Sequence, residues 1–269
     1  MGISSDGGAS WNISKQGPLV WSGWLLTFFL TDYGAAAGQY GGSVAYSADA
    51  DTIVWSTSTK GVLRSQYQGS FTAVSGLPAS AVIASDKRDN KYFYGGSGSA
   101  FYVSSDTGST FAKGGAVGSA TSIRDIAAHP ATAGTVFVST DAGVFRSTDF
   151  GATFAKLGGG DDAVKDTQRI AVGLGAGSSA WNVYAFGDGA AGKKLYATAD
   201  DGATWVDIQG SQGFGSITAC VLAGSANNAG QVYVGTNGRG VFWAQGTIAA
   251  SGGSARRGVR GRWVPAADH

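Results

Sequence analysis

The chain has few cysteines, prolines and charged residues. One cysteine cannot form a disulfide within the chain, and only four prolines occur in 269 residues. Charged residues make up 14% of the sequence and the net charge is +1, which excludes a global field that would attract nucleic acid or an anionic membrane. No Cys/His cluster has metal-ligand spacing, and no glycine-rich run continues into a phosphate-binding loop. We therefore expect no metal, no cofactor, and neither a nucleic-acid nor a membrane partner.

Long hydrophobic runs are also lacking. The longest, Pro18 to Leu30, has 13 residues, whereas a transmembrane helix needs about 20. It is wrongly placed for a signal peptide, and the start of the chain runs directly into a turn sequence, so we expect no signal peptide. Residues 18–38 are expected to form an irregular apolar insert. Residues 246–269, which are rich in arginine but have no strand pattern, are expected to form a disordered basic tail.

Glycine and aromatic residues, in contrast, are abundant. The chain has 45 glycines, and aromatic residues make up 12% of it. Glycine allows tight turns, and aromatic side chains favour strands. This combination is typical of an all-β protein built from many short hairpins.

One eight-residue sequence recurs along the chain in the form [ST]-x-D-x-G-x-[ST]-[WF]. It occurs at Ser4 to Trp11, Ser104 to Phe111, Ser147 to Phe154 and Thr198 to Trp205. The Asp can accept hydrogen bonds from backbone N–H groups, the Gly can adopt a positive φ, and the aromatic residue can anchor the following strand. We interpret the aspartates as structural turn residues: Asp6, Asp106, Asp149 and Asp200.

A second repeat precedes these turns, with equivalent strand residues at positions 55, 94, 138, 185 and 234. A spacing of about 40 to 50 residues, with four short strands in each unit, is typical of β-propeller blades. Four whole units fit residues 43–74, 80–113, 122–157 and 167–208. Residues 216–245 supply three further strands, and residues 2–14 supply one hairpin. Residues 1–245 are thus predicted to form an incomplete propeller of about five blades, either closed by its two ends or part of a larger ring.

The recurring turns resemble the Asp-box repeats of sialidases, family 74 glycoside hydrolases and sortilin-type receptors. A sialidase would need an arginine cluster and a Tyr–Glu nucleophile pair, which this chain does not offer. Further segments, from Gly2–Gly8 to Val232–Phe242, resemble the carboxy-terminal propeller of fungal family 74 xyloglucanases. The resemblance runs in order from residue 2 to about 245, apart from about 18–38, and implies a parent propeller of seven blades.

The family resemblance implies a secreted parent enzyme that has a second, amino-terminal propeller and binds xyloglucan or a related β-glucan between its two propellers. It also implies that the glucan bond is hydrolysed with inversion, which requires two carboxyl groups, a general acid and a general base. Neither sequence context that carries the family's catalytic aspartates occurs here. We therefore expect no catalytic residue in this chain and no activity of the chain alone.

A remaining glycan-binding strip is expected on the propeller face opposite the Asp turns. Aromatic rings stack on sugars, and Asp, Asn and Arg side chains bind hydroxyl groups. The candidates are Tyr40, Asp188, Phe214, Asn237 and Arg239, with Asp141, Asp161 and Asp162 on the same face. A non-catalytic propeller that binds a glycan or a protein remains the alternative function.

Overall fold

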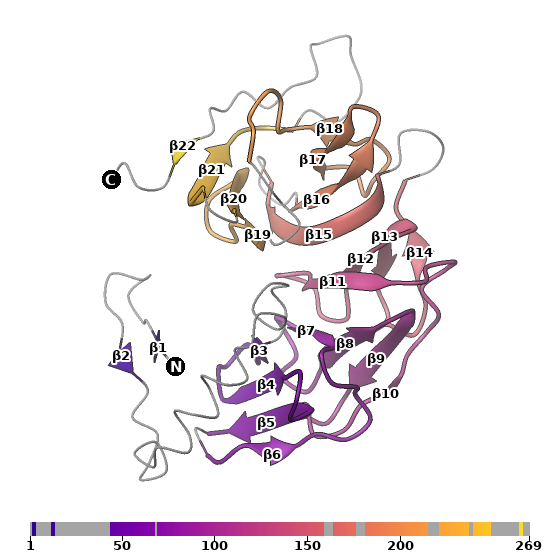
Figure 1. Ribbon diagram of the computed structural model, residues 1–269, viewed down its shortest axis with the longest axis vertical. Coiled ribbons are helices and arrows are strands. Elements are labelled where there is room, and N and C mark those ends of the chain that lie inside the picture. The colour runs from indigo at the N-terminus through magenta and orange to yellow at the C-terminus, as the bar shows by residue number, and fades with distance from the viewer. Residues whose placement is uncertain are drawn as a thin grey trace.

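The computed structural model describes residues 2–3, 12–13, 44–67, 69–158, 164–175, 181–214, 221–236, 239–248 and 264–265. Every regular element in these ranges is a β-strand (Figure 1). The strands form five four-stranded antiparallel sheets and one separate two-stranded hairpin. The all-β propeller architecture predicted from the repeats is confirmed.

Each four-stranded sheet is one blade, and its strands follow one another in chain order. Blade 1 comprises β3 (Val44–Tyr46), β4 (Thr52–Ser56), β5 (Val62–Gln66) and β6 (Thr72–Ala73). Blade 2 comprises β7 (Val82–Ser85), β8 (Phe93–Ser97), β9 (Ala100–Ser104) and β10 (Ala112–Lys113). Blade 3 comprises β11 (Ile123–Ala128), β12 (Val136–Thr140), β13 (Gly143–Ser147) and β14 (Ala155–Lys156).

The last two blades follow the same plan. Blade 4 comprises β15 (Lys165–Leu174), β16 (Trp181–Gly189), β17 (Gly192–Thr198) and β18 (Val206–Asp207). Blade 5 comprises β19 (Val221–Gly224), β20 (Gln231–Gly235), β21 (Val241–Gln245) and β22 (Val264–Pro265). The first strands of successive blades contact one another in the order β3, β7, β11, β15 and β19, and together they line a central cavity of about 630 Å³.

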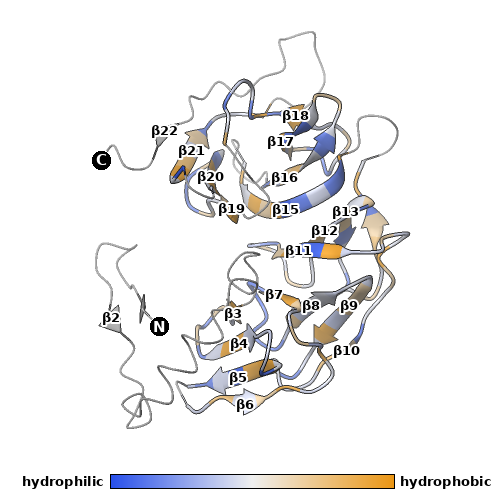
Figure 2. Ribbon diagram, in the orientation of Figure 1, coloured by the Kyte–Doolittle hydropathy of each residue, from blue (hydrophilic) through white to orange (hydrophobic). Residues whose placement is uncertain are grey.

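The hydrophobic core lies between the blades. Apolar residues occur along the strands among polar ones (Figure 2), so each sheet can bury apolar side chains against its neighbour. Between blades 2 and 3, for example, Tyr94 and Phe101 pack with Ile126, Val138 and Phe145. Equivalent clusters lie between blades 1 and 2, 3 and 4, and 4 and 5. The apolar faces therefore hold the blades side by side.

The three described copies of the Asp turn share one hydrogen-bond pattern. In the first, Asp106 Oδ1 accepts the Ser104 hydroxyl at 2.7 Å and the Thr110 N–H at 2.9 Å, and Oδ2 accepts the Thr110 hydroxyl at 2.7 Å. The same bonds recur at Asp149 and Asp200. Hydrogen bonds from Thr153 and Ser147 hold the pKa of Asp149 at about 2. The aspartates thus accept turn hydrogen bonds, which supports the structural role proposed for them.

The two ends of the chain differ from each other. The hairpin of β1 (Gly2–Ile3) and β2 (Asn12–Ile13) forms its own sheet, with Gly2 opposite Ile13. Blade 5 takes its fourth strand from Val264–Pro265, which pairs with β21, so the hairpin is not part of that blade. Val264 and Pro265 lie in the tail that was expected to have no strand, and the expectation is corrected at these two residues. The insert at 18–38 and most of the tail lie outside the described residues.

Candidate functional site

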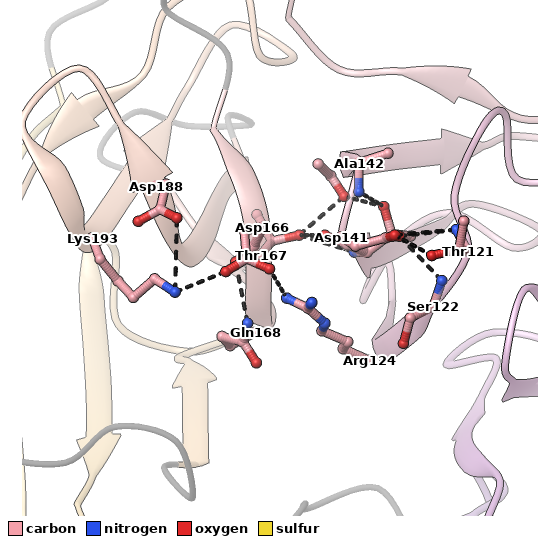
Figure 3. A network of polar contacts seen from close by, with 12 residues as sticks. Thr121, Ser122, Arg124, Asp141, Ala142, Asp166, Thr167, Gln168, Asp188 and Lys193 are labelled. Carbon is pink, nitrogen blue, oxygen red and sulfur yellow. Dashed lines mark hydrogen bonds and ion pairs between the residues drawn. The ribbon is translucent and has the colours of Figure 1, made fainter.

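The turns between the second and third strands of the blades form one rim of the propeller. This rim carries a network of charged and polar side chains (Figure 3). Its first part is Asp141, in the turn between β12 and β13. Asp141 Oδ1 accepts the backbone N–H groups of Thr121 at 3.0 Å and Ser122 at 3.1 Å, and Oδ2 accepts the Thr121 hydroxyl. These hydrogen bonds lower the pKa of Asp141, and the bond from the Thr121 hydroxyl has the largest effect. Asp141 therefore ties the connection between blades 2 and 3 to the turn of blade 3.

The second part of the network is centred on Asp166, near the start of β15. Asp166 pairs with Arg124 of blade 3 and with Lys193, whose Nζ lies 2.7 Å from Oδ2. Partial burial alone would raise the pKa of Asp166, but the hydrogen bonds and charges of Lys193 and Arg124 outweigh it, and the pKa is lowered. The Asp166 N–H also donates to the Asp141 carbonyl at 3.1 Å. Blades 3 and 4 thus present one continuous polar strip.

Asp188, one of the residues predicted to bind a glycan, lies at the end of this strip. It belongs to the hairpin between β16 and β17, and its Oδ2 is 3.7 Å from Lys193 Nζ. The Asp188 side chain is 47% exposed, so one side of it remains open to a ligand. Exposed ion pairs of this kind contribute little stability, about 0 to 1 kcal/mol each. These ion pairs therefore add little to the stability of the fold.

The other predicted rim residues have different positions. Arg239 is exposed in the turn before β21, and its Nη1 donates to the Gly213 carbonyl at 3.1 Å. Phe214 is only 1% exposed and packs on Phe242, with ring centroids 5.5 Å apart. Its ring has no free face to stack on a sugar, so the prediction that Phe214 binds substrate is corrected: it is a core residue. The remaining rim candidates lie outside the described residues: Tyr40, Asp161, Asp162 and Asn237. Asp6, predicted as a structural residue of the first Asp turn, also lies outside them.

Sequence reasoning missed the residues that connect this rim, namely Arg124, Asp166 and Lys193. They lie at the ends of strands in two different blades, and 42 residues separate Arg124 from Asp166. Each stands beside another charged residue near a strand end, and nothing within one repeat shows which residue of a neighbouring blade it meets. No local pattern marks Arg124 or Asp166, because the ion pair that joins them forms only between two blades.

A second polar position lies in the wall of the central cavity. Asp125 Oδ1 accepts the Ile126 N–H at 3.0 Å, and Oδ2 accepts the Ile170 N–H of blade 4 at 3.2 Å. Burial raises the pKa of Asp125 to about 7, against the lowering effects of the Arg169 charge and of these two N–H groups. Arg169, 3% exposed, lines the same cavity. Asp125 thus joins β11 to β15 deep inside the ring, away from the rim.

Within the described part of the chain, no three His, Cys, Asp or Glu side chains are grouped so that they could hold a metal ion. Within the same residues there is also no helix long and apolar enough to cross a membrane.

Comparisons with known proteins give a consistent result. No protein-family model matches the chain. The chain is 59% identical over 251 residues to a xyloglucanase of Hypocrea jecorina, a match that covers 93% of this chain and 27% of the relative. It is 32% identical over 263 residues to a xyloglucanase of a Paenibacillus species, covering 94% of this chain and 23% of that relative. The chain therefore spans about a quarter of the length of the curated relatives it matches.

Solved structures of GH74 proteins are also similar to this chain. The GH74 xyloglucanase of Xanthomonas campestris superposes with a TM-score of 0.64 at 27% identity, over 75% of this chain and 29% of that one. The GH74 enzyme of Niastella koreensis superposes with a TM-score of 0.62 at 25% identity, over 77% of this chain and 31% of that one. The fold, the order of the repeats and the sequence identity agree, and the chain belongs to the GH74 xyloglucanase family as a propeller segment of those longer enzymes.

Proposed function

We propose that this chain contributes a glucan-binding rim to a xyloglucan-degrading enzyme and does not itself cleave the polysaccharide. The observation that carries this proposal is the 59% identity to a xyloglucanase over 93% of the chain. The parent enzyme would hydrolyse β-1,4-glucan bonds with inversion and would need the other propeller as its partner. Because xyloglucan is a polymer too large to enter a cell, we place the parent enzyme outside it.

The chemistry of the described carboxyl groups supports the non-catalytic part of the proposal. A general acid in glycoside hydrolysis needs a raised pKa and an oxygen directed at the substrate. On the rim, hydrogen bonds and ion pairs lower the pKa values of Asp141 and Asp166. Asp125 has a raised pKa, but both of its oxygens accept backbone N–H groups within the central cavity. These carboxyl groups therefore suit structural or binding roles.

The proposed glucan-binding role of the rim can be tested by native gel electrophoresis in the presence of xyloglucan. In a native gel that contains xyloglucan, we expect the 269-residue chain to migrate more slowly than in a gel without it. Replacing both Asp188 and Arg239 with alanine removes two exposed groups that can bind sugar hydroxyls. We expect this variant to bind about fivefold more weakly, which corresponds to about 1 kcal/mol.

The matched control for this experiment is Asp89→Ala. Asp89 lies in the turn between β7 and β8, on the edge of the blades away from the rim network, and accepts the Lys91 N–H at 3.0 Å. Its replacement is expected to leave the retardation unchanged. Equal migration of the native chain with and without xyloglucan would contradict the proposed binding role.

A further inference from the structure

The turn after the first strand is closed in the same way in blades 2, 3 and 5, by a side chain that we call the turn cap. In blade 2, Asp86 Oδ1 accepts the N–H groups of the second and third residues after it, at 2.8 and 2.9 Å. In blade 5, the Ser225 hydroxyl accepts the equivalent N–H groups at 3.3 and 2.9 Å. In blade 3, His129 Nδ1 accepts those of Ala131 and Thr132, both at 3.1 Å. The N–H of each cap donates to a carbonyl at the start of the second strand, so the three positions are equivalent.

The cap of blade 3 differs from the others because an imidazole can accept only through an unprotonated nitrogen. A neutral imidazole has one donor and one acceptor nitrogen, whereas an imidazolium has two donors. Since Nδ1 of His129 accepts, the ring is neutral and carries its proton on Nε2. A second proton can be added only at Nδ1, where it would face two N–H donors. A serine hydroxyl such as that of Ser225 is not protonated in this way, whereas histidine changes its charge between pH 5 and 8.

The His129 ring lies where blade 3 meets blade 4. Its centroid is 5.0 Å from that of Trp181, at the start of β16, and 6.4 Å from that of Phe137 in β12. The charged groups that act on it are Arg146 of β13 and Asp201 of the blade 4 Asp turn, which pair with each other at 2.7 Å. Burial lowers the pKa of His129 below its ordinary value of 6.5; the charge of Asp201 opposes this shift, and that of Arg146 adds to it.

We propose that His129 is a pH-sensitive cap, which holds the turn of blade 3 against Trp181 of blade 4 when it is neutral and releases both when it is protonated. The proton comes from solvent and binds Nδ1, so the N–H groups of Ala131 and Thr132 lose their acceptor. Both residues are exposed, so water can replace the acceptor while the strands of the blade stay paired. The charged ring then leaves its partly buried place beside Trp181, because burial of a charge is costly.

This device makes the stability of the chain depend on pH. Because the pKa of His129 is lower in the folded chain, the unfolded chain binds the proton more readily between the two pKa values. The cap therefore adds its full stability above pH 6.5 and loses it as the pH falls through the folded pKa.

Nuclear magnetic resonance of the histidine rings tests the proposal in the folded chain. The chain has two histidines, His129 and His269, so His269→Gln leaves a single imidazole to follow. We expect this ring to carry its proton on Nε2 in the neutral form and to titrate below pH 6.5. The amide signals of Ala131 and Thr132 and the indole signal of Trp181 should move with the same midpoint. A neutral ring protonated at Nδ1, or signals that do not follow the ring, would overturn the proposal.

Chemical denaturation of His129→Ser provides the second test. Serine keeps an acceptor at this position, as Ser225 does in blade 5, but does not titrate. Between about pH 7.5 and pH 5, we expect the unfolding constant of the native chain to rise about fivefold relative to that of the variant, the effect of losing about one net hydrogen bond. Groups that titrate in both proteins, such as Asp125 with a pKa of about 7, cancel in this ratio. The control, His269→Gln, should follow the native chain, whereas equal pH dependence of the native chain and His129→Ser would contradict the proposal.

Discussion

Replacing Asp86 with alanine is expected to lower the free energy of unfolding by about 3 to 5 kcal/mol. Asp86 is 1% exposed, between β7 and β8. Its Oδ1 accepts the N–H groups of Arg88 at 2.8 Å and Asp89 at 2.9 Å. Its Oδ2 accepts the Tyr94 hydroxyl at 2.8 Å and the Gly134 N–H of blade 3 at 2.8 Å. The substitution leaves two buried donors, the Tyr94 hydroxyl and the Gly134 N–H, and two partly buried backbone N–H groups without this acceptor, and it removes a bond between two blades.

Chemical denaturation followed by tryptophan fluorescence measures this loss. Asp86→Asn is an informative second variant, because its amide keeps one acceptor oxygen for the turn but directs N–H groups at the Gly134 N–H. It should lose more than half as much stability as the alanine variant. Asp89→Ala, in the same turn, removes one bond to the Lys91 N–H and should cost less than about 1 kcal/mol. Equal effects of Asp86→Ala and Asp89→Ala would contradict this assignment.

Gly151→Ala should be almost as damaging, at about 3 kcal/mol. Gly151 lies in the Asp turn of Asp149. Its φ of +82° would cost an L-residue about 1 to 2 kcal/mol. A Cβ at this position would lie 2.3 Å from Cε1 of Phe101 in blade 2. Phe101 is 2% exposed and packs edge-on against Phe154, with centroids 4.8 Å apart, so it has little room to move. Overpacking of a filled core costs about 1 to 3 kcal/mol more.

Gly192→Ala isolates the packing part of this effect. Gly192 has a nearly identical φ of +85°, in the hairpin between β16 and β17, and an added Cβ there would meet no atom within 4 Å. Both variants carry the same backbone strain, and only Gly151→Ala adds a clash between blades. Thermal and chemical denaturation of the two should differ by about 2 kcal/mol. Equal losses would show that the Asp turn is not wedged against the preceding blade.

The regular part of the fold could be predicted because each blade repeats the same local rules. For example, one four-stranded unit was predicted at residues 122–157, and the structure has its four strands within these bounds, from β11 at Ile123–Ala128 to β14 at Ala155–Lys156. Turn chemistry and the alternation of apolar residues fix these elements locally. Repetition then supplies the topology, since each sheet needs a neighbour to cover its apolar face.

The candidate site was harder to predict because it depends on contacts between blades. Asp166 pairs with Arg124 across two blades, and no local pattern marks either residue. Phe214 has the polar and glycine-rich neighbours of an exposed loop, yet its ring enters the core between blades 4 and 5. Asp86 resembles an ordinary turn aspartate in sequence, but the turn of blade 3 buries it. Burial by another repeat cannot be read from a single repeat.

Whether this chain cleaves xyloglucan is measured by the release of new reducing ends by the purified 269-residue protein. Because the described carboxyl groups have turn, rim and cavity roles, we expect no turnover above the buffer background. The contrary result would be steady release of reducing ends that a single Asp→Ala substitution within this chain abolishes while the variant remains folded.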